Sequence, residues 1–151
     1  MTLELFDAAY DDPVAAALIE AVQQEYVVRY GGPDGTPLVG EEFTPPAGVF
    51  LLARIGDELI GCAGLRRHDD GTVELKRMYI RRDHRGRGHG RALLHAVEDR
   101  ARALGYRRLI LETGTPQPEA LALYVAQGYH RVANFGHYRR SPMSRCFGKD
   151  L

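Results

Sequence analysis

The stretch "RRDHRGRGHGRALL", from Arg81 to Leu94, restricts the fold of this chain more than any other feature. It combines five arginines with three alternating glycines, and a helical apolar pattern follows it directly. The preceding stretch, "TVELKRMYI", has the composition of a strand. A glycine-rich turn before a helix presents unpaired backbone N–H groups and the positive end of the helix dipole, which together attract anions. The sequence therefore predicts a strand–turn–helix unit that holds a phosphate group.

Two familiar phosphate-binding patterns do not match this turn. A Walker motif ends in Gly-Lys-Ser/Thr, whereas this turn ends in Gly90-Arg91-Ala92. A dinucleotide-binding turn has the spacing Gly-x-Gly-x-x-Gly after the first strand of a βαβ unit. Here the glycines alternate and lie in the middle of the chain. The turn therefore predicts a phosphate site of another kind.

The charge of the whole chain makes the basic run a local feature. The sequence contains 20 Lys and Arg residues and 20 Asp and Glu residues, so the formal net charge is zero. A protein whose main partner is a long polyanion usually carries excess positive charge. We therefore expect a small anionic ligand and no nucleic acid, with a nucleic-acid-binding domain as the competing hypothesis.

Several other classes of protein are disfavoured by the sequence. Cys62 and Cys146 lie far apart, and Cys62 falls in an apolar run, which predicts a reduced core thiol and no disulfide. The six histidines form no ligand pair, so no metal is expected. No apolar window is long enough to cross a bilayer, and the first residues do not resemble a secretory signal. We therefore expect a cytoplasmic protein.

Hydrophobic periodicity predicts a single α/β domain over residues 1–151, built on a mixed sheet. The expected elements are a strand at 2–8, a helix at 11–32, three strands within 49–80, a helix at 90–106, a strand at 107–113, a helix at 117–129 and two final strands at 130–138 and 144–151. The order is β-α-β-β-β-α-β-α-β, with one further strand if both final segments pair. The Gly- and Pro-rich stretch 31–48 is expected to be a loop, either functional or merely mobile.

Local signals place the ends and faces of these elements. Asp12 is a candidate N-cap with Pro13 at the first helical position, and Gly31 ends the first helix. Two dipeptides that supply positive-φ residues, Gly56-Asp57 and Asp70-Gly71, are expected at the hairpin turns. The apolar stripe of the first helix is expected to comprise Val14, Ala17, Leu18, Ala21, Val22 and Tyr26. The stripe of the second helix is expected to comprise Leu94, Val97, Ala101 and Leu104.

Three segments of the chain together resemble the GCN5-related N-acetyltransferase (GNAT) superfamily, in its small single-domain form. The turn matches the family pattern Arg/Gln-x-x-Gly-x-Gly/Ala at Arg85, Gly88 and Gly90. "EALALYVAQGY" resembles the second family motif, and "LIGCAGLRR" fits the strand before the first. The resemblance implies a mostly antiparallel mixed sheet flanked by helices. It also implies an enzyme that transfers the acetyl group of acetyl-CoA to a primary amine of a small molecule or peptide.

The resemblance also implies where the coenzyme lies. Its pantetheine arm is expected beside Met78, Tyr79 and Ile80, where a backbone N–H can polarise the thioester carbonyl. Its pyrophosphate is expected on the turn, at Arg85, Gly86, Arg87, Gly88, His89, Gly90 and Arg91. Arg81 and Arg82 match no position of the motif and are expected in solvent.

Two residues are candidates for catalysis. Tyr124 matches the tyrosine of the second motif, and the resemblance implies that it protonates the leaving thiolate. The apolar pattern by itself favours a core aromatic that shares a stripe with Leu121 and Val125. Glu74 is the candidate general base, and the alternative for it is a cross-strand ion pair with Lys76 or Arg66.

The acceptor is expected to contact two segments that the resemblance leaves variable, residues 25–43 and 134–147. Three acids in the first segment are candidates for attracting an amine: Glu25, Glu41 and Glu42. The alternative to an enzyme is a module that binds acyl-CoA as a sensor without turnover. Either protein is compatible with a homodimer.

Overall fold

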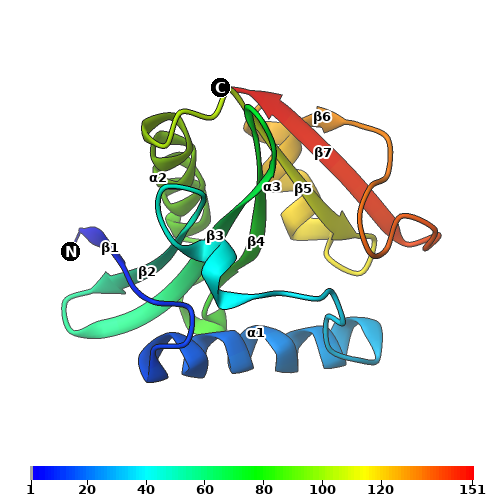
Figure 1. Ribbon diagram of the computed structural model, residues 1–151. Coiled ribbons are helices and arrows are strands. Elements are labelled where there is room, and N and C mark those ends of the chain that lie inside the picture. Colours follow the sequence, from blue (N-terminus) through cyan, green and yellow to red (C-terminus); the bar gives the residue numbers. More distant parts are fainter. Residues whose placement is uncertain (1) are drawn as a thin grey trace.

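The computed structural model describes residues 2–151, which form one sheet, three α-helices and two short 3-10 helices (Figure 1). The strands are β1 (Leu3–Asp7), β2 (Val49–Ile55), β3 (Glu58–Asp69), β4 (Thr72–Ile80), β5 (Arg108–Gly114), β6 (His130–Arg131) and β7 (Ser144–Asp150). The helices are α1 (Pro13–Tyr30), η1 (Gly40–Phe43), η2 (Arg82–His84), α2 (His89–Ala103) and α3 (Pro118–Ala126). Within the described residues, no helix is both long and apolar enough to span a membrane.

The sheet is mixed and mostly antiparallel, which confirms the predicted fold class. Its seven strands are ordered β1-β2-β3-β4-β5-β7-β6. Among the described strands, β4 and β5 alone pair in parallel, from Thr72–Arg108 to Leu75–Leu111, and α2 provides the crossover between them. The strand–turn–helix unit predicted from the glycine-rich run is therefore β4, η2 and α2, at the centre of the fold.

The ends of α1 are those that its capping residues predict. The Asp12 carboxylate accepts a hydrogen bond from the Val14 N–H at 2.8 Å. At the other end Gly31 has φ 85° and donates to the Val27 carbonyl at 2.9 Å. The predicted face was partly wrong, because Val14 and Ala17 are exposed while Ala15 is buried with Leu18 and Val22. Consecutive residues of a helix point about 100° apart. The buried face is therefore centred on Ala15, Leu18 and Val22, and Val14 lies beside it.

Both faces of the sheet are buried, each under different helices. The odd-numbered residues of β2, Val49 to Ala53, belong to the core that α2 and α3 cover. The intervening Phe50 and Leu52 belong to the core under α1 and η1. Figure 1 shows α1 on one side of the sheet and α2 and α3 on the other. Because each side chain from Val49 to Ala53 meets a core, this part of β2 is apolar without alternation.

The C-terminal part differs from its prediction. The strand expected at 130–138 is limited to His130–Arg131, which pairs with Phe147 and Gly148 of β7. Gly136 has φ 78°, a left-handed conformation that does not continue a strand. The chain therefore forms a loop before β7, and this loop carries Tyr138 to the region between β4 and β5.

Candidate active site

The candidate site lies where β4 and β5 separate. Their pairing ends at Leu75–Leu111. Beyond it β4 continues to Ile80, and β5 stays paired with β7, as it is from Arg108 to Gly114. Arg77 has φ 58°, which is unusual for a residue other than glycine, and the register of β4 against β3 shifts in the same stretch. These irregularities form a bulge, which bends a strand away from its neighbour. The edge of β4 beyond Leu75 is therefore left without a β5 partner.

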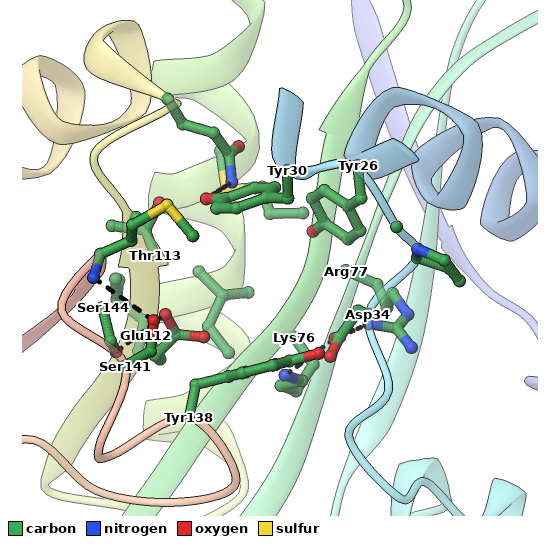
Figure 2. A pocket seen from close by; sticks show the side chains of 18 of the residues that line it. Tyr26, Tyr30, Asp34, Lys76, Arg77, Glu112, Thr113, Tyr138, Ser141 and Ser144 are labelled. Atoms are coloured by element: carbon green, nitrogen blue, oxygen red, sulfur yellow. Dashed lines mark hydrogen bonds and ion pairs between the residues drawn. The ribbon is translucent and has the colours of Figure 1, made fainter. Parts of the chain in front are cut away.

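A cavity of about 250 Å³ occupies this gap and opens to solvent. Its walls come from the end of α1 and the following loop, from β4 and β5, from α3 and from the loop before β7 (Figure 2). Polar and aromatic side chains in these walls include Tyr26, Tyr30, Asp34, Lys76, Arg77, Glu112, Thr113, Tyr124, Tyr138 and Ser144. Met78 also lines the cavity, on the β4 edge where the pantetheine arm was expected.

The turn after β4 has the geometry of an anion site. Gly86 and Gly88 have φ values of 76° and 82°. Gly88 is the N-cap of α2, and no side chain caps the helix. Among the described residues, a side chain at Gly86 or Gly88 would meet open space beyond its chain neighbours, which leaves room for a ligand at the start of α2. Gly90 lies in the first turn of α2 and faces Leu123 of α3, and its role beside the pyrophosphate stays a prediction.

Arg85 is engaged by the protein itself. Its Nε donates to the Ile80 carbonyl at 2.8 Å, and its Nη2 donates to the Glu25 carboxylate at 2.7 Å. Its guanidinium also lies 5.4 Å from the ring centroid of Tyr79. Arg85 therefore joins α1 to the turn and leaves fewer donors for a phosphate than the motif predicts. Arg87 and Arg91 of the predicted set are exposed, and His89 is half-buried.

Tyr124 is a core residue that also faces the cavity. It is 7% exposed, and its ring packs 5.7 Å from that of Tyr129. Its hydroxyl points toward Met78, whose sulfur lies 3.9 Å away. Burial raises the pKa of Tyr124 well above its ordinary value, so the phenol keeps its proton. Val125, expected to share its stripe, is 61% exposed.

Glu74 is engaged in an ion pair outside the cavity. Its buried carboxylate accepts from the Arg66 Nε at 2.9 Å, which is one of the two cross-strand pairs considered for it. It is not among the residues that line the cavity. Its assignment as general base therefore gains no support from these contacts and stays a prediction.

Glu112, which the sequence reading missed, is the acid that lines the cavity from β5. The Ser144 hydroxyl donates to its carboxylate at 3.0 Å, and no described residue forms an ion pair with it. Burial raises its pKa from 4.5 to about 7. The only sequence signal was a carboxylate in the otherwise apolar strand "RLILET".

The two segments expected to contact the acceptor do line the cavity, but through other residues than the acids named. The first contributes Tyr26, Tyr30 and Asp34, and the second contributes Tyr138 and Ser144. The acids take other places: Glu25 pairs with Arg85, Glu42 pairs with Arg66, and Glu41 is exposed on η1. Part of the 31–48 loop is thus a wall of the site.

The cysteines and one group of potential metal ligands lie outside the cavity. Cys62 and Cys146 are free and buried, and burial raises the pKa of Cys62 to about 12. A thiol of this kind is a poor nucleophile. Glu58, Asp83 and His84 bring their ligand atoms within 4.8 Å of one another at the protein surface. The contact of 3.1 Å between His84 Nε2 and Glu58 Oε1 accounts for this proximity.

Comparison with known proteins agrees with this geometry. The sequence model of the acetyltransferase (GNAT) family matches residues 15–129. This chain belongs to the GNAT family. An IAA acetyltransferase from Azospirillum brasilense is 40% identical over 103 residues, which are 68% of this chain and 67% of that protein. The GNAT chain is also similar to solved structures.

A provisionally named acyl-CoA N-acyltransferase from Klebsiella pneumoniae has a TM-score of 0.82 and 33% identity, covering 99% of this chain and 98% of that one. A GNAT acetyltransferase from Elizabethkingia anophelis with bound acetyl-CoA shares the fold, with a TM-score of 0.71 and 20% identity over 99% and 98% of the two chains. The family and these relatives support an acetyl-CoA-dependent acyltransferase that acts on an amine.

Proposed function

We propose that this GNAT protein acetylates the primary amine of a small-molecule acceptor by direct transfer from acetyl-CoA. The observation that carries the proposal is that a protonated phenol, Tyr124, and a carboxyl with a pKa of about 7, Glu112, line the same cavity. Neither cysteine lines that cavity, which supports transfer without a covalent enzyme intermediate. A volume of about 250 Å³ also suits a small acceptor.

Glu112 and Tyr124 carry out the two proton transfers that the reaction needs. Acetyl-CoA supplies the acetyl group as a thioester. The bond from the amine nitrogen to the acetyl carbon forms as the carbon–sulfur bond breaks. Glu112 takes one of the two protons that the acceptor ammonium loses. Tyr124 gives its proton to the coenzyme thiolate, and the second amine proton restores the phenol.

The remaining assignments of the site are part of the same proposal. The open edge of β4 at Met78–Ile80 is the place for the pantetheine arm, and the turn 85–91 is the place for the pyrophosphate. The uncapped start of α2 and the left-handed glycines support the second assignment. Glu74 remains the alternative base. A cytoplasmic location, a homodimer, and the lack of a metal and of nucleic-acid binding stay predictions.

The test is release of free thiol from acetyl-CoA with a panel of primary amines, together with mass spectrometry of the products. We expect thiol release that depends on the amine and an acetylated product of matching mass. Calorimetry with acetyl-CoA accompanies the assay. Binding without thiol release for any amine contradicts the proposal and favours the sensor module.

A further inference from the structure

Two buried cations stand side by side in the wall of the cavity. Lys76 and Arg77 are consecutive on the bulge of β4, and their side chains are only 7% and 3% exposed. Both pair with one oxygen, Oδ2 of Asp34, with 3.3 Å between that oxygen and the Lys76 Nζ. The other oxygen of Asp34 accepts from the backbone N–H and the hydroxyl of Thr36, at 2.9 Å and 2.6 Å. The Asp34 carboxylate, with both oxygens already hydrogen-bonded, is therefore the shared partner of Lys76 and Arg77.

This arrangement leaves positive charge and hydrogen-bond donors unmatched. An ammonium has three donor hydrogens, but Asp34 is the single hydrogen-bond partner that the described residues provide for Lys76. The buried Nε of Arg77 has no partner there either. Glu112 balances the second cation only in part, because burial raises its pKa to about 7 although the positive charge of Lys76 lowers it. Buried charges are costly unless they are paired, so the wall at Lys76 favours an anionic group.

The carboxyl of Glu112 lies on another wall of the same cavity. Figure 2 shows Glu112 of β5 close to Ser144 of β7, whereas Asp34, Lys76 and Arg77 group on the far side. Tyr138 extends between the two groups, and Tyr26 and Tyr30 close the cavity from α1. A molecule that spans this space meets a cation at one end and a proton acceptor at the other, with aromatic rings along its length.

We propose that the acceptor is a small amino acid, whose carboxylate binds Lys76 while its amine lies at Glu112. This inference rests on the proposed acetyl transfer. An acceptor of this kind supplies the anion that the buried cations lack, and its aromatic or aliphatic part packs on the tyrosines. A primary amine without a carboxylate leaves the Lys76 donors unmatched.

The test compares matched acceptors with the whole protein and acetyl-CoA. One triad is L-phenylalanine, L-phenylalaninamide and phenethylamine, and further triads vary the side chain. We expect kcat/KM to be higher for the free acid in at least one triad, by about tenfold or more, because a charge-assisted contact is lost in the other two. Equal or better turnover of the amide and the amine in every triad overturns the inference while the acetyltransferase function stands.

Variants locate the effect at Lys76. Lys76→Met should lose the preference for the free acid, mainly through a higher KM for that acid, so that the three members of each triad give similar kcat/KM values. Arg67→Met is the matched control, because it removes one positive charge from an exposed position of β3 outside the cavity, and it should keep the preference.

The outcomes separate the two proposals. Lys76→Gln provides a second variant if Lys76→Met does not fold, and circular dichroism checks both. If neither folds, the wild-type triads decide. A folded Lys76 variant that keeps the preference overturns the inference. No turnover of any amine overturns the proposed function, and this inference with it.

Discussion

At the residue scale, Tyr124 and Glu112 have the protonation behaviour that an acid and a base need. Burial raises the pKa of both side chains and favours the neutral, protonated form of each. The phenol remains protonated and is able to donate. The carboxyl titrates near pH 7, where a base is strong enough to accept a proton and is still partly ionised. Each role predicts a different kinetic result.

Replacing Tyr124 with Phe should lower kcat by roughly 10²-fold, because a general acid is lost. The KM for acetyl-CoA should change little, since the ring still packs against Tyr129 and Phe147. Single-turnover rates with a good acceptor are the appropriate measurement, because slow product release can mask the effect. An unchanged single-turnover rate would mean that Tyr124 is only a core aromatic.

Replacing Glu112 with Gln should remove a pH-dependent step. In the wild type, kcat/KM should rise through an apparent pKa of about 7 as the carboxyl ionises. The variant should show no such rise. At pH values above this pKa, its kcat/KM should be roughly 10²-fold lower than that of the wild type. The pH–rate profiles of wild type, Glu112→Gln and Glu74→Gln decide between the two acids. Loss of the step in Glu74→Gln alone would identify Glu74 as the base.

Stability provides a control for the Glu112 variant. The pKa of Glu112 in the folded protein lies above its ordinary value of 4.5. Its contribution to stability is therefore complete below pH 4.5 and is lost as the pH rises through about 7. Glu112→Gln carries no charge to bury, so its melting temperature should fall less between pH 5 and pH 8 than that of the wild type. Lost activity at pH 8 is then not caused by unfolding.

At the element scale, the unit formed by β4, the turn and α2 should bind the coenzyme through its backbone. Gly88→Val places a β-branched residue at φ 82° and covers the open start of α2. We expect at least about tenfold weaker acetyl-CoA binding by calorimetry, because close approach to the N–H groups is lost. Gly105→Val is a matched control, since it has φ 93° at the other end of the same helix. Equal affinity of both variants would rule out the pyrophosphate assignment.

At the scale of the whole molecule, the coenzyme should stabilise the folded state, because a ligand that binds the folded protein and not the unfolded chain shifts the equilibrium toward folding. A ligand at 100 times its Kd adds about 2.7 kcal/mol to the free energy of unfolding. For a chain of this size that corresponds to a rise in melting temperature of about 5–10 °C. We expect this shift with acetyl-CoA and with coenzyme A, and none with duplex DNA. A comparable shift with DNA would revive the nucleic-acid hypothesis.

Features that depend on near neighbours in the chain were predictable. Asp12, Pro13 and Gly31 delimit α1 because capping bonds and left-handed glycines act within one turn of helix. The glycine-rich run placed the turn and the start of α2 for the same reason. Its resemblance to the GNAT motif and the order of the elements also indicated the family and the mostly antiparallel sheet.

Several residues of the cavity could be assigned to it only from the tertiary structure. Glu112 looks like one polar residue in a buried strand until β4 leaves β5 at Leu111 and exposes it to the gap. Asp34 reaches Arg77 from 43 residues away, and Tyr138 arrives on a loop that alternation had suggested was a strand. Local sequence patterns indicate the type and the ends of helices and strands. Which charges share a wall depends on strand order and on where pairing ends, and these follow from long-range packing.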